Sequence, residues 1–351
     1  MNVAEIPNLE LEEIISFNEI YDSMHRCKRG VTWKSSVASF VLNDIESCLK
    51  LSDQLKNGTY KARKTSKFTL YTPKRRDVVS IAFRDRVYQR SLNDNSIYPT
   101  LTNTFIAENF ACQKGKGTDR ARNQLIYDLR SYYRKHGNKG YVLQCDIHGY
   151  YPNMRHDVAK EVFRKLLPDD IYWHVERIID DQYDREIGFN PGSQMIQIAG
   201  ISVLNPIDHY AKEDLRLKWY QRYMDDFIAI HNSKEYLEEC LQKIKERIEE
   251  MGFEFNPKKT RVFELSEGIE YLGFRFRLTD TGKVLMFIDP DNVKREKRKL
   301  VRMVAKVKRG EMDKHRVDEH FSCWLNSHAS KGTSYKLVQN MKKFYYDLWR
   351  K

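Results

Sequence analysis

The stretch KWYQRYMDDFIAI, residues 218–230, places two adjacent aspartates between two apolar runs. Short apolar runs on either side of a polar break predict two β-strands joined by a tight turn, with Asp225 and Asp226 at its tip. From this stretch alone two interpretations stay open. The acids belong either to a solvated turn with spare charge or to a site that holds a metal ion.

A second acid is predicted to end a strand. In GYVLQCDIHGYYPNM, residues 140–154, an apolar run stops at Asp146 and loop residues follow. If this strand neighbours the hairpin in one sheet, Asp146, Asp225 and Asp226 converge. Three carboxylates at close range resist ionising together unless a cation neutralises them. Two Mg²⁺ ions held there would orient a 3′-hydroxyl and a triphosphate for in-line phosphoryl transfer, whereas the competing interpretation is that Asp-Asp merely favours a turn.

Composition favours a polyanionic partner. The chain has 351 residues, a formal net charge of +12 and 12% aromatic residues, which suits binding to nucleic acid or to an anionic membrane surface. Its residues include no apolar run of eighteen, and the N-terminus lacks an apolar signal core, so the membrane is the weaker choice and a cytoplasmic location is expected. Six scattered cysteines without CxxC spacing predict free thiols rather than a zinc site.

The remaining pattern predicts alternating helices and strands. Helices are expected within 10–60, with apolar residues at helical spacing over 36–55, and a hairpin with a basic tip over 67–83. A helix from Arg84 is expected to stop before Pro99. Further helices are expected at 117–136, 156–182, 192–215 and 233–252, strands within 252–265 and 269–278, a basic helix over 292–316 and a last helix over 333–349. No composition break supports independent domains before about residue 285.

Taken in order over about residues 35–280, these segments resemble the motifs of reverse transcriptases. YMDD and Asp146 in CDIHGYYPNM resemble the palm motifs. The other resembling segments are YTPKRRDVVSIAFRDRVYQRSL (71–92, fingers), FACQKGKGTDRA (110–121, the next block), PGSQMIQIAGISVLNP (191–206, the helix before the hairpin), NPKKTRV (256–262, the motif behind it) and YLGFRF (271–276, primer grip).

The resemblance implies an α/β (α+β) right-hand polymerase with fingers, a palm built on an antiparallel sheet backed by helices, and a helical thumb. The expected subdomains are an N-terminal helical extension at 1–60, fingers at 61–139, a palm at 140–285 with part of the fingers in 156–190, and a basic thumb at 286–351. The implied activity is RNA-directed DNA polymerase, which copies an RNA template into cDNA from a nucleic-acid primer and dNTPs with two Mg²⁺ ions, or Mn²⁺ in their place.

The resemblance also assigns roles to individual residues. The metal ligands are Asp146, Asp225, Asp226 and the backbone carbonyl of Ile147. Tyr151 would pack against the nucleotide sugar and disfavour a 2′-hydroxyl, with core packing as the alternative. Lys259 would protonate the leaving pyrophosphate, with Lys258 as a competing choice. The remaining substrate and primer positions are Lys74 and Arg76, which would clamp the triphosphate unless they form a solvated turn, Gln194 and Gln197 on the helix before the hairpin, and Leu272 and Gly273 in the primer grip.

Basic residues at two places are candidates for binding nucleic acid. In the fingers, Arg84 and Arg86 would contact template phosphates or form internal salt bridges with Asp85. In the thumb, a cationic helix would track the duplex unless it is only a solvated face. The full set of these candidates is Arg84, Arg86, Lys114, Lys116, Lys294, Lys297, Arg298 and Arg302.

Among reverse transcriptases, the chain looks most like the bacterial and phage enzymes of diversity-generating retroelements and their antiphage-defence relatives. It departs from the G-x-x-x-S-Q pattern typical of the former, because Ile196 stands where the serine would be. A structured noncoding RNA or a small helical accessory protein would be a further partner. Two alternatives stay open: a polymerase of the same fold with DNA-templated or template-independent addition, and a catalytically silent RNA-binding relative.

Overall fold

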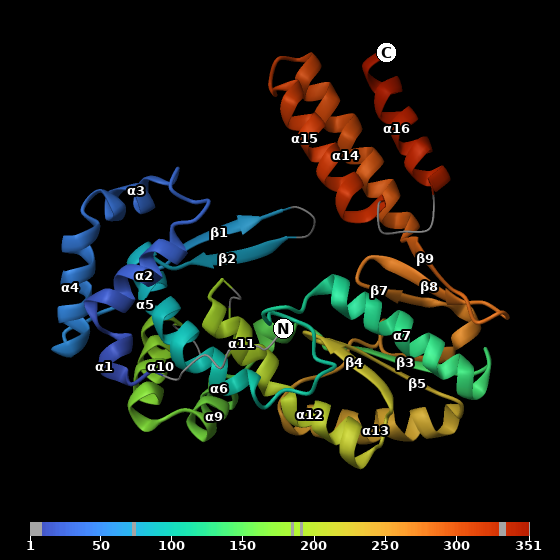
Figure 1. Cartoon of the computed structure of the whole chain (residues 1–351), viewed down its shortest axis with the longest axis horizontal. Helices are drawn as coiled ribbons and strands as arrows, with labels where there is room; N and C mark the ends of the chain where they lie inside the picture. Colours follow the sequence, from blue (N-terminus) through green and yellow to red (C-terminus); the bar gives the residue numbers. More distant parts are fainter. Residues whose placement is uncertain (1–8, 72–74, 184–185, 190–191, 330–334, 351) are drawn as a thin grey trace. The chain divides into compact units, whose positions relative to one another are not determined.

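The structure, a computed structural model, describes residues 9–71, 75–183, 186–189, 192–329 and 335–350. Strands form three sheets among many helices (Figure 1), so the expected α+β class is confirmed. A two-stranded sheet pairs β1 with β2, a four-stranded sheet has the order β4-β5-β3-β6, and a three-stranded sheet has the order β7-β8-β9. The strands are β1 (Ser66–Leu70), β2 (Arg76–Ser80), β3 (Tyr141–Asp146), β4 (Trp219–Tyr223), β5 (Asp226–His231), β6 (Arg261–Glu264), β7 (Ile269–Tyr271), β8 (Phe274–Leu278) and β9 (Val284–Ile288).

The chain divides into two compact units. The first unit comprises Met1–Gly117, Gln144–Phe227 and Cys240–Thr260, and the second comprises Thr118–Leu143, Ile228–Glu239 and Arg261–Lys351. Strands β3 and β5 therefore contribute residues to both units. The three acids singled out in the sequence all belong to the first unit.

The first unit begins with a helical layer, α1 (Leu11–Ile14), α2 (Phe17–Cys27), α3 (Ser35–Leu42) and α4 (Asp44–Lys56). Ser16 starts α2 by accepting a hydrogen bond from the Glu19 amide at 3.3 Å. The helical pattern predicted over 36–55 is correct in type, but Asn43, with φ −121° and ψ 50°, breaks it into two helices. Helix α2 packs against both α4 and α5 (Phe83–Leu92).

The prediction that a helix stops before Pro99 is wrong. The chain stays helical through α5, a π-helical turn at Asn93–Ile97, and α6 (Tyr98–Thr102). Pro99 lies in the first turn of α6, where a backbone N–H has no partner in the same helix in any case. The wider π-helical turn thus begins a new helix one residue before the proline.

The middle of the chain is helical where predicted, with interruptions. Its helices are α8 (Tyr150–Asn153), α9 (His156–Leu166), α10 (Asp169–Gln182), α11 (Gln194–Val203), α12 (Asn205–His209), a π-helical turn at Tyr210–Asp214, and α13 (Lys234–Glu250). Pro168 stands at the N-cap position of α10 and separates this helix from α9. Of the strand expected within 252–265, only β6 forms, and Phe255 contributes an isolated bridge to Ile147.

The second unit contains α7 (Thr118–His136), α14 (Pro290–Lys308), α15 (Lys314–Trp324), a π-helical turn at Leu325–Ala329 and α16 (Tyr335–Arg350), besides a 3₁₀ turn at Leu265–Glu267. Two elements of this unit are not among those predicted from the sequence: β9, which pairs antiparallel with β8, and α15. The basic helix was predicted too long. It ends at Lys308, Gly310 follows with φ +75°, and the Asp313 side chain caps α15.

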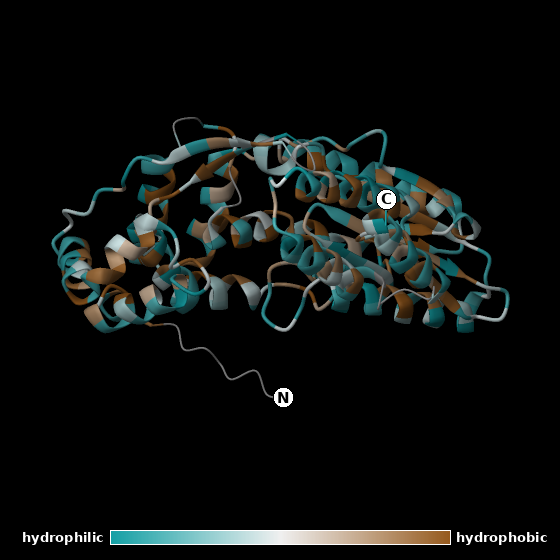
Figure 2. Cartoon of the chain, turned by 90° about the horizontal axis from the view of Figure 1, so that it is seen from above, coloured by the Kyte–Doolittle hydropathy of each residue, from teal (hydrophilic) through white to brown (hydrophobic). Residues whose placement is uncertain are grey.

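The core buries most of β5. Phe227, Ile228, Ala229 and Ile230 are each at most 1% exposed, as expected for a strand covered on both faces. The helices carry both hydrophobic and hydrophilic residues (Figure 2), which is typical of amphipathic helices around a core. The described helices include none with the length and apolar character that a membrane crossing requires.

Candidate active site

The predicted hairpin forms, and its turn is tight. Strands β4 and β5 are neighbours in the sheet, and Met224 and Asp225 join them. Met224 has φ +58°, the left-handed conformation that two-residue hairpin turns need at their first central position and that usually selects glycine. Asp225 therefore lies in the turn and Asp226 is the first residue of β5.

The buried side chain of Arg222 holds this turn through hydrogen bonds. Its guanidinium and the Asp208 carboxylate are both 0% exposed, with Nε 2.7 Å from Oδ1 and Nη2 2.6 Å from Oδ2. Its Nη1 donates to the Met224 carbonyl at 2.7 Å, and Nη2 also donates to the Ile201 carbonyl at 2.9 Å. The strained residue of the turn is thus held by a buried cation. This role of Arg222 is not among the predictions from the sequence, although a charge inside an apolar strand, two residues before the turn, is a signal for it.

Asp146 ends β3 as predicted and is 7% exposed. Its Oδ1 lies 2.5 Å from the Lys259 Nζ, and its Oδ2 accepts a hydrogen bond from the Asn256 side-chain amide at 3.1 Å. The Asn256 backbone amide also donates to the Asp146 carbonyl at 2.8 Å. The segment at 256–260 therefore fixes Asp146 from one side. Lys258, the competing choice for the proton donor, is exposed and bonds Asn256 only through its backbone amide, at 3.1 Å.

Electrostatics show that the three acids share one environment. Burial raises the pKa of Asp225, and the charge of Asp146 raises it further. Burial, the charge of Asp225 and a hydrogen bond to Asp146 together raise the pKa of Asp226 to about 7. Partial burial lowers the pKa of the Lys259 ammonium, but the hydrogen bond to Asp146 and the charges of all three acids together outweigh burial and raise this pKa. Asp225 and Asp226 therefore have too little positive charge near them to keep both pKa values at their usual level.

The donor set fits a hard divalent cation. Asp146, Asp225 and Asp226 offer only carboxylate oxygens, which suit Mg²⁺ or Mn²⁺ rather than zinc. Over the residues that the structure describes, no three acidic, histidine or cysteine side chains stand at the spacing of a finished metal site. Both Asp146 oxygens are instead occupied by nitrogen donors. Ile147 is 1% exposed and forms a bridge with Phe255, and its role as a ligand stays a prediction.

Tyr151 lies against α11. Its hydroxyl donates to the Gln197 carbonyl at 3.3 Å. A Cβ built on Gly200 would lie only 2.6 Å from the Tyr151 oxygen, so the glycine makes room for the ring. Burial raises the pKa of the Tyr151 hydroxyl, which keeps it protonated. The residue as a whole is half-buried, and the charge of Asp225 acts on its hydroxyl.

The other predicted substrate positions are less defined. Gln194 is exposed at the start of α11, and Gln197 follows one turn later. Lys74 lies outside the described residues, and of Arg76 only the backbone, at the start of β2, is described. Leu272 (φ +47°) and Gly273 (φ +83°) form the two-residue turn between β7 and β8, and positive φ at both positions defines the type I′ turn that antiparallel hairpins favour.

The cations within the segment expected to form the fingers divide into a packed group and a less constrained one. Arg84 donates to the Gln54 side chain and lies 5.0 Å from the Tyr60 ring centroid. Lys116 donates to the carbonyls of Ala107 at 3.1 Å and Asn109 at 2.7 Å, and Lys114 lies 5.2 Å from the Tyr98 ring centroid. These contacts constrain the three side chains, whereas Arg86 forms no ion pair with Asp85 or any other described acid.

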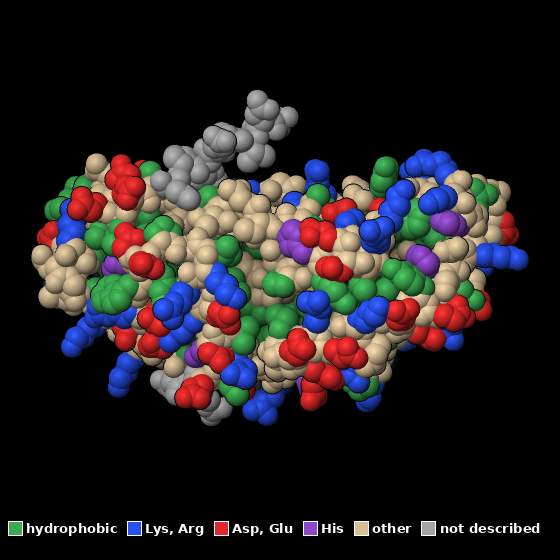
Figure 3. All heavy atoms as spheres, turned by 90° about the horizontal axis from the view of Figure 1, so that it is seen from below, with side chains coloured by type: hydrophobic (Ala, Val, Ile, Leu, Met, Phe, Trp, Pro, Cys, Tyr) green, Lys and Arg blue, Asp and Glu red, His purple; other side chains and the backbone are tan. Residues whose placement is uncertain are grey.

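On α14, Lys294, Arg298 and Arg302 are exposed and follow each other at intervals of four, so they lie on one helix face. Lys297 is half-buried and lies 5.1 Å from the Phe344 ring centroid, which is a packing position. A surface stripe of three cations is the kind of feature that contacts phosphates. By contrast, acidic and basic side chains are interspersed on the face that Figure 3 shows.

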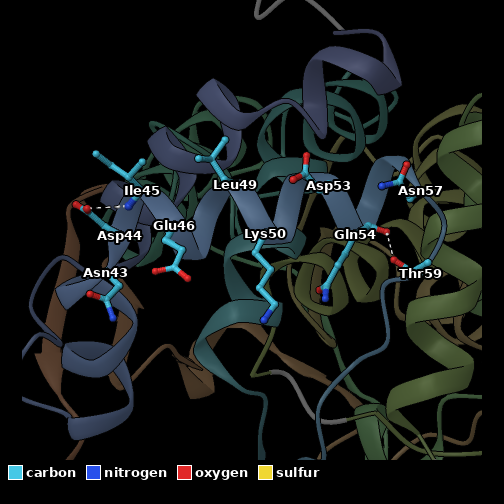
Figure 4. A pocket seen from close by; sticks show the side chains of 10 residues that line it. All are labelled: Asn43, Asp44, Ile45, Glu46, Leu49, Lys50, Asp53, Gln54, Asn57 and Thr59. Carbon is cyan, nitrogen blue, oxygen red and sulfur yellow. Dashed lines mark hydrogen bonds between the residues drawn. The ribbon is translucent and has the colours of Figure 1, made fainter.

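A hollow of about 630 Å³ lies along α4, and none of Asp146, Asp225 and Asp226 lines it. Figure 4 shows Glu46, Lys50 and Gln54 projecting from one side of this helix, while Ile45 and Leu49 project from another. The wide opening and the mixed lining give no convergent set of chemical groups. All six cysteines are free, as predicted, and they contribute nothing to the site.

The sequence matches one known protein family. Residues 62–276, more than half of the chain, match the family described as reverse transcriptase (RNA-dependent DNA polymerase). No curated protein matches the chain. One similar solved structure is apo telomerase from Candida tropicalis, truncated from the C-terminal domain, with 14% identity and a TM-score of 0.45. That match covers 63% of this chain and 54% of the telomerase chain, so this chain spans about half of its length.

Proposed function

Since the chain belongs to the reverse transcriptase (RNA-dependent DNA polymerase) family, we propose that it synthesises DNA on an RNA template from dNTPs and a primer. The observation that carries this proposal is the meeting of Asp146, Asp225 and Asp226 at the ends of adjacent strands, with the pKa values of both turn acids raised. An acid pair without a paired cation is suited to divalent metal ions, which in turn bind a polyphosphate.

Two divalent ions, when bound, supply the charge that a growing 3′-end and a triphosphate need for in-line transfer. Asp225 and Asp226 would hold them, because their oxygens form no ion pair with a described Lys or Arg. Asp146 would join them once Lys259 and Asn256 release its oxygens. The brace from Arg222 to the Met224 carbonyl, 2.7 Å long, keeps the turn in place while the carboxylates exchange partners.

Lys259 is suited to move a proton. Its ammonium, 2.5 Å from Asp146 Oδ1, carries a raised pKa and is therefore protonated at neutral pH. In the proposed reaction it leaves Asp146 and donates this proton to the departing pyrophosphate. Its side chain is 56% exposed, so it has the freedom to move between the two partners.

Tyr151 is suited to select deoxynucleotides. Contacts with Gln197 and Gly200 hold its ring, so it cannot withdraw from a 2′-hydroxyl placed against it. Fixed steric exclusion of this kind discriminates between substrates only when the excluding group is rigid.

The predicted division into an N-terminal helical extension, fingers, palm and thumb belongs to the same proposal. So do the predicted contacts of Lys74 and Arg76 with the triphosphate, and those of Lys294, Arg298 and Arg302 with the duplex.

The biological setting that we propose is a bacterial or phage retroelement of the diversity-generating type, or an antiviral defence system. The support is the resemblance of the ordered segments at 71–92, 110–121 and 191–206. Ile196 in place of the serine of the diversity-generating pattern favours the defence relatives. A noncoding RNA or a small helical protein encoded nearby would distinguish the two settings.

Primer extension tests the proposal. The purified protein should extend a DNA primer on an RNA template when Mg²⁺ is present. Asp225→Asn keeps the side-chain size but removes the charge, and it should lower the rate by about a hundredfold or more, since even supporting residues of metal sites cost ten- to a hundredfold. Asp53→Asn, at an exposed position on α4, is the matched control. Activity that survives Asp225→Asn would contradict the assignment.

Parallel reactions on an RNA template, on a DNA template and without template separate the alternatives. Preference for DNA, or addition without template, would replace the RNA-directed activity by another polymerase activity of the same fold. Tight RNA binding without incorporation on any template would indicate a silent relative. The intact acid triad argues against that outcome, because an unused acid pair costs stability.

A further inference from the structure

A hollow of about 270 Å³ in the first unit is lined by arginines from separate parts of the chain. Arg26 and Arg29 come from α2 and the segment after it, and Arg86 and Arg90 come from α5. The start of α11, at Ser193 and Gln194, forms another part of the lining. The first two arginines precede residue 62, where the family match begins, so the hollow depends on the N-terminal extension.

The lining carries more positive than negative charge. Arg26 pairs with Glu19 and lies 3.3 Å from Asp94, and Arg90 lies 2.6 Å from the same Asp94 carboxylate. Two of the four guanidinium charges are thus compensated. No described acid pairs with Arg29 or Arg86.

Arg86 is the clearest unsatisfied group. Its Nε is buried and has no hydrogen-bond acceptor among the described residues. The adjacent acid does not help, because Asp85 accepts from the Tyr60 hydroxyl at 2.8 Å and the Arg63 amide at 2.9 Å. Burial also raises the pKa of the neighbouring Cys27 thiol to about 11, so that group stays neutral. A buried guanidinium nitrogen without an acceptor is costly unless a ligand supplies one.

The N-terminus of α11 adds hydrogen-bond donors to the positively charged lining. Ser193 is 6% exposed, and its hydroxyl donates to the Gln89 side-chain carbonyl at 2.7 Å instead of capping the helix. The N-cap residue of this ten-residue helix therefore makes no side-chain cap bond to the first turn. Backbone amides at a helix N-terminus favour an anion.

We propose that this hollow binds a phosphate group. Two uncompensated guanidinium groups and a helix N-terminus provide the charge and the forked donors that suit a phosphate oxyanion. Cationic and apolar ligands do not fit this lining. Under the proposed polymerase function, on which this further step rests, the phosphate belongs to the template strand. Ser193 and Gln197, whose carbonyl holds Tyr151, are one helical turn apart, about 6 Å, so one strand can reach both places.

Thermal unfolding in potassium phosphate and in potassium chloride at equal ionic strength tests the pocket. Phosphate should raise the melting temperature of the wild-type protein more than chloride does, because a ligand that binds only the folded state stabilises it. Arg29→Gln and Arg86→Gln should each remove most of this difference. Lys50→Gln, which removes one exposed charge from α4, should keep it. If all three variants retain the difference, the pocket is overturned.

The source of the phosphate is tested with a single-stranded oligoribonucleotide, measured by fluorescence anisotropy over a range of salt. Loss of one contact to a phosphate of the single strand should reduce the magnitude of the slope of log affinity against log salt by about 0.7. A slope reduced by this amount in Arg29→Gln or Arg86→Gln, but not in Lys50→Gln, supports the assignment of the phosphate to the template strand. An unchanged slope with a lost phosphate effect overturns the template assignment and supports a site for free phosphate or nucleotide.

These measurements do not depend on catalysis. Asp225→Asn should bind phosphate and the oligoribonucleotide as the wild type does, because Asp225 does not line the hollow. A protein that shows the phosphate effect but synthesises no DNA would contradict the proposed function and leave the pocket standing. Arg29 is exposed and forms no described side-chain contact, so Arg29→Gln also keeps the test valid if Arg86→Gln impairs folding.

Discussion

Replacing Arg222 by methionine should destabilise the protein strongly. The substitution leaves Asp208, which is 0% exposed, with only the Tyr220 hydroxyl at 2.7 Å and the Asn109 amide at 3.3 Å as donors. Removing one partner of a buried ion pair costs about 3–5 kcal/mol. Since whole proteins are stable by roughly 5–15 kcal/mol, the variant should remain folded at low temperature but lose a large part of its free energy of unfolding.

A second substitution, Asp208→Leu, should restore much of that loss. It removes the stranded carboxylate, and apolar replacements of buried ion pairs are often neutral. Recovery should be incomplete, because the Tyr220 hydroxyl and the Asn109 amide then lose an acceptor. Urea unfolding of the wild type, both single variants and the double variant gives the coupling energy, which should exceed about 2 kcal/mol. Arg164→Met, at an exposed position on α9, is the control and should change stability little.

DNA synthesis should behave differently from stability. The double variant still lacks the Nη1 donor to the Met224 carbonyl, and Met224 keeps its left-handed conformation at φ +58°, a strain of order 1–3 kcal/mol. The turn with Asp225 should therefore be less well positioned, and synthesis should stay low after stability recovers. A double variant that regains both would refute the bracing role. A loss below about 1 kcal/mol in Arg222→Met would refute the buried ion pair as a stabilising contact.

Three further predictions concern the site itself. The pKa of Asp226, about 7, predicts that metal-free stability falls as pH rises from about 4 through 7, because the folded state retains a proton that the unfolded chain releases near 3.9; urea titrations at several pH values should show this fall, and Asp226→Asn should flatten it. Gly200→Ala places a Cβ 2.6 Å from the Tyr151 oxygen, so the ring must move, and the ratio of kcat/KM for dCTP over CTP should decrease. Lys259→Ala should slow synthesis by about a hundredfold or more if this residue donates the proton, whereas a loss below tenfold in single-turnover rates would leave it only a contact of Asp146.

The parts of the fold that hold the acids were predictable because local pattern and tertiary burial agree there. The runs before Asp146 and on both sides of Asp225 contain enough apolar residues to predict β3, β4 and β5, and the strands form at those positions. A two-residue break between two such runs leaves only a tight turn. Convergence of the three acids followed once the two elements were assumed to be neighbours, which the strand order bears out.

The errors arose where local signals point away from the tertiary outcome. Pro99 normally ends a helix, but a π-helical turn places it at the start of a new one. The basic run at 292–316 continues across Gly310 without a change in composition, although φ +75° at that glycine ends α14. Arg222 was missed because its partner Asp208 is fourteen residues earlier, on a helix, and sequence spacing does not show that pairing.

The first unit treats its buried acids in two ways. Asp208 and Asp85 are 0% exposed, and both are satisfied, the first by Arg222 and the second by the Tyr60 hydroxyl and the Arg63 amide. Asp225 and Asp226 are half-buried with raised pKa values and form no ion pair with a described Lys or Arg. Burial raises the pKa of Asp85 as well, despite its two donors, so the difference lies in the partners: Asp208 has a buried cation beside it, whereas the two acids at the hairpin tip have no described cation paired with them. Arg222 donates its hydrogen bonds to Asp208 and to the backbone of the turn. It therefore fixes the position of the two turn acids without forming an ion pair with them. A divalent cation bound there would supply the missing positive charge.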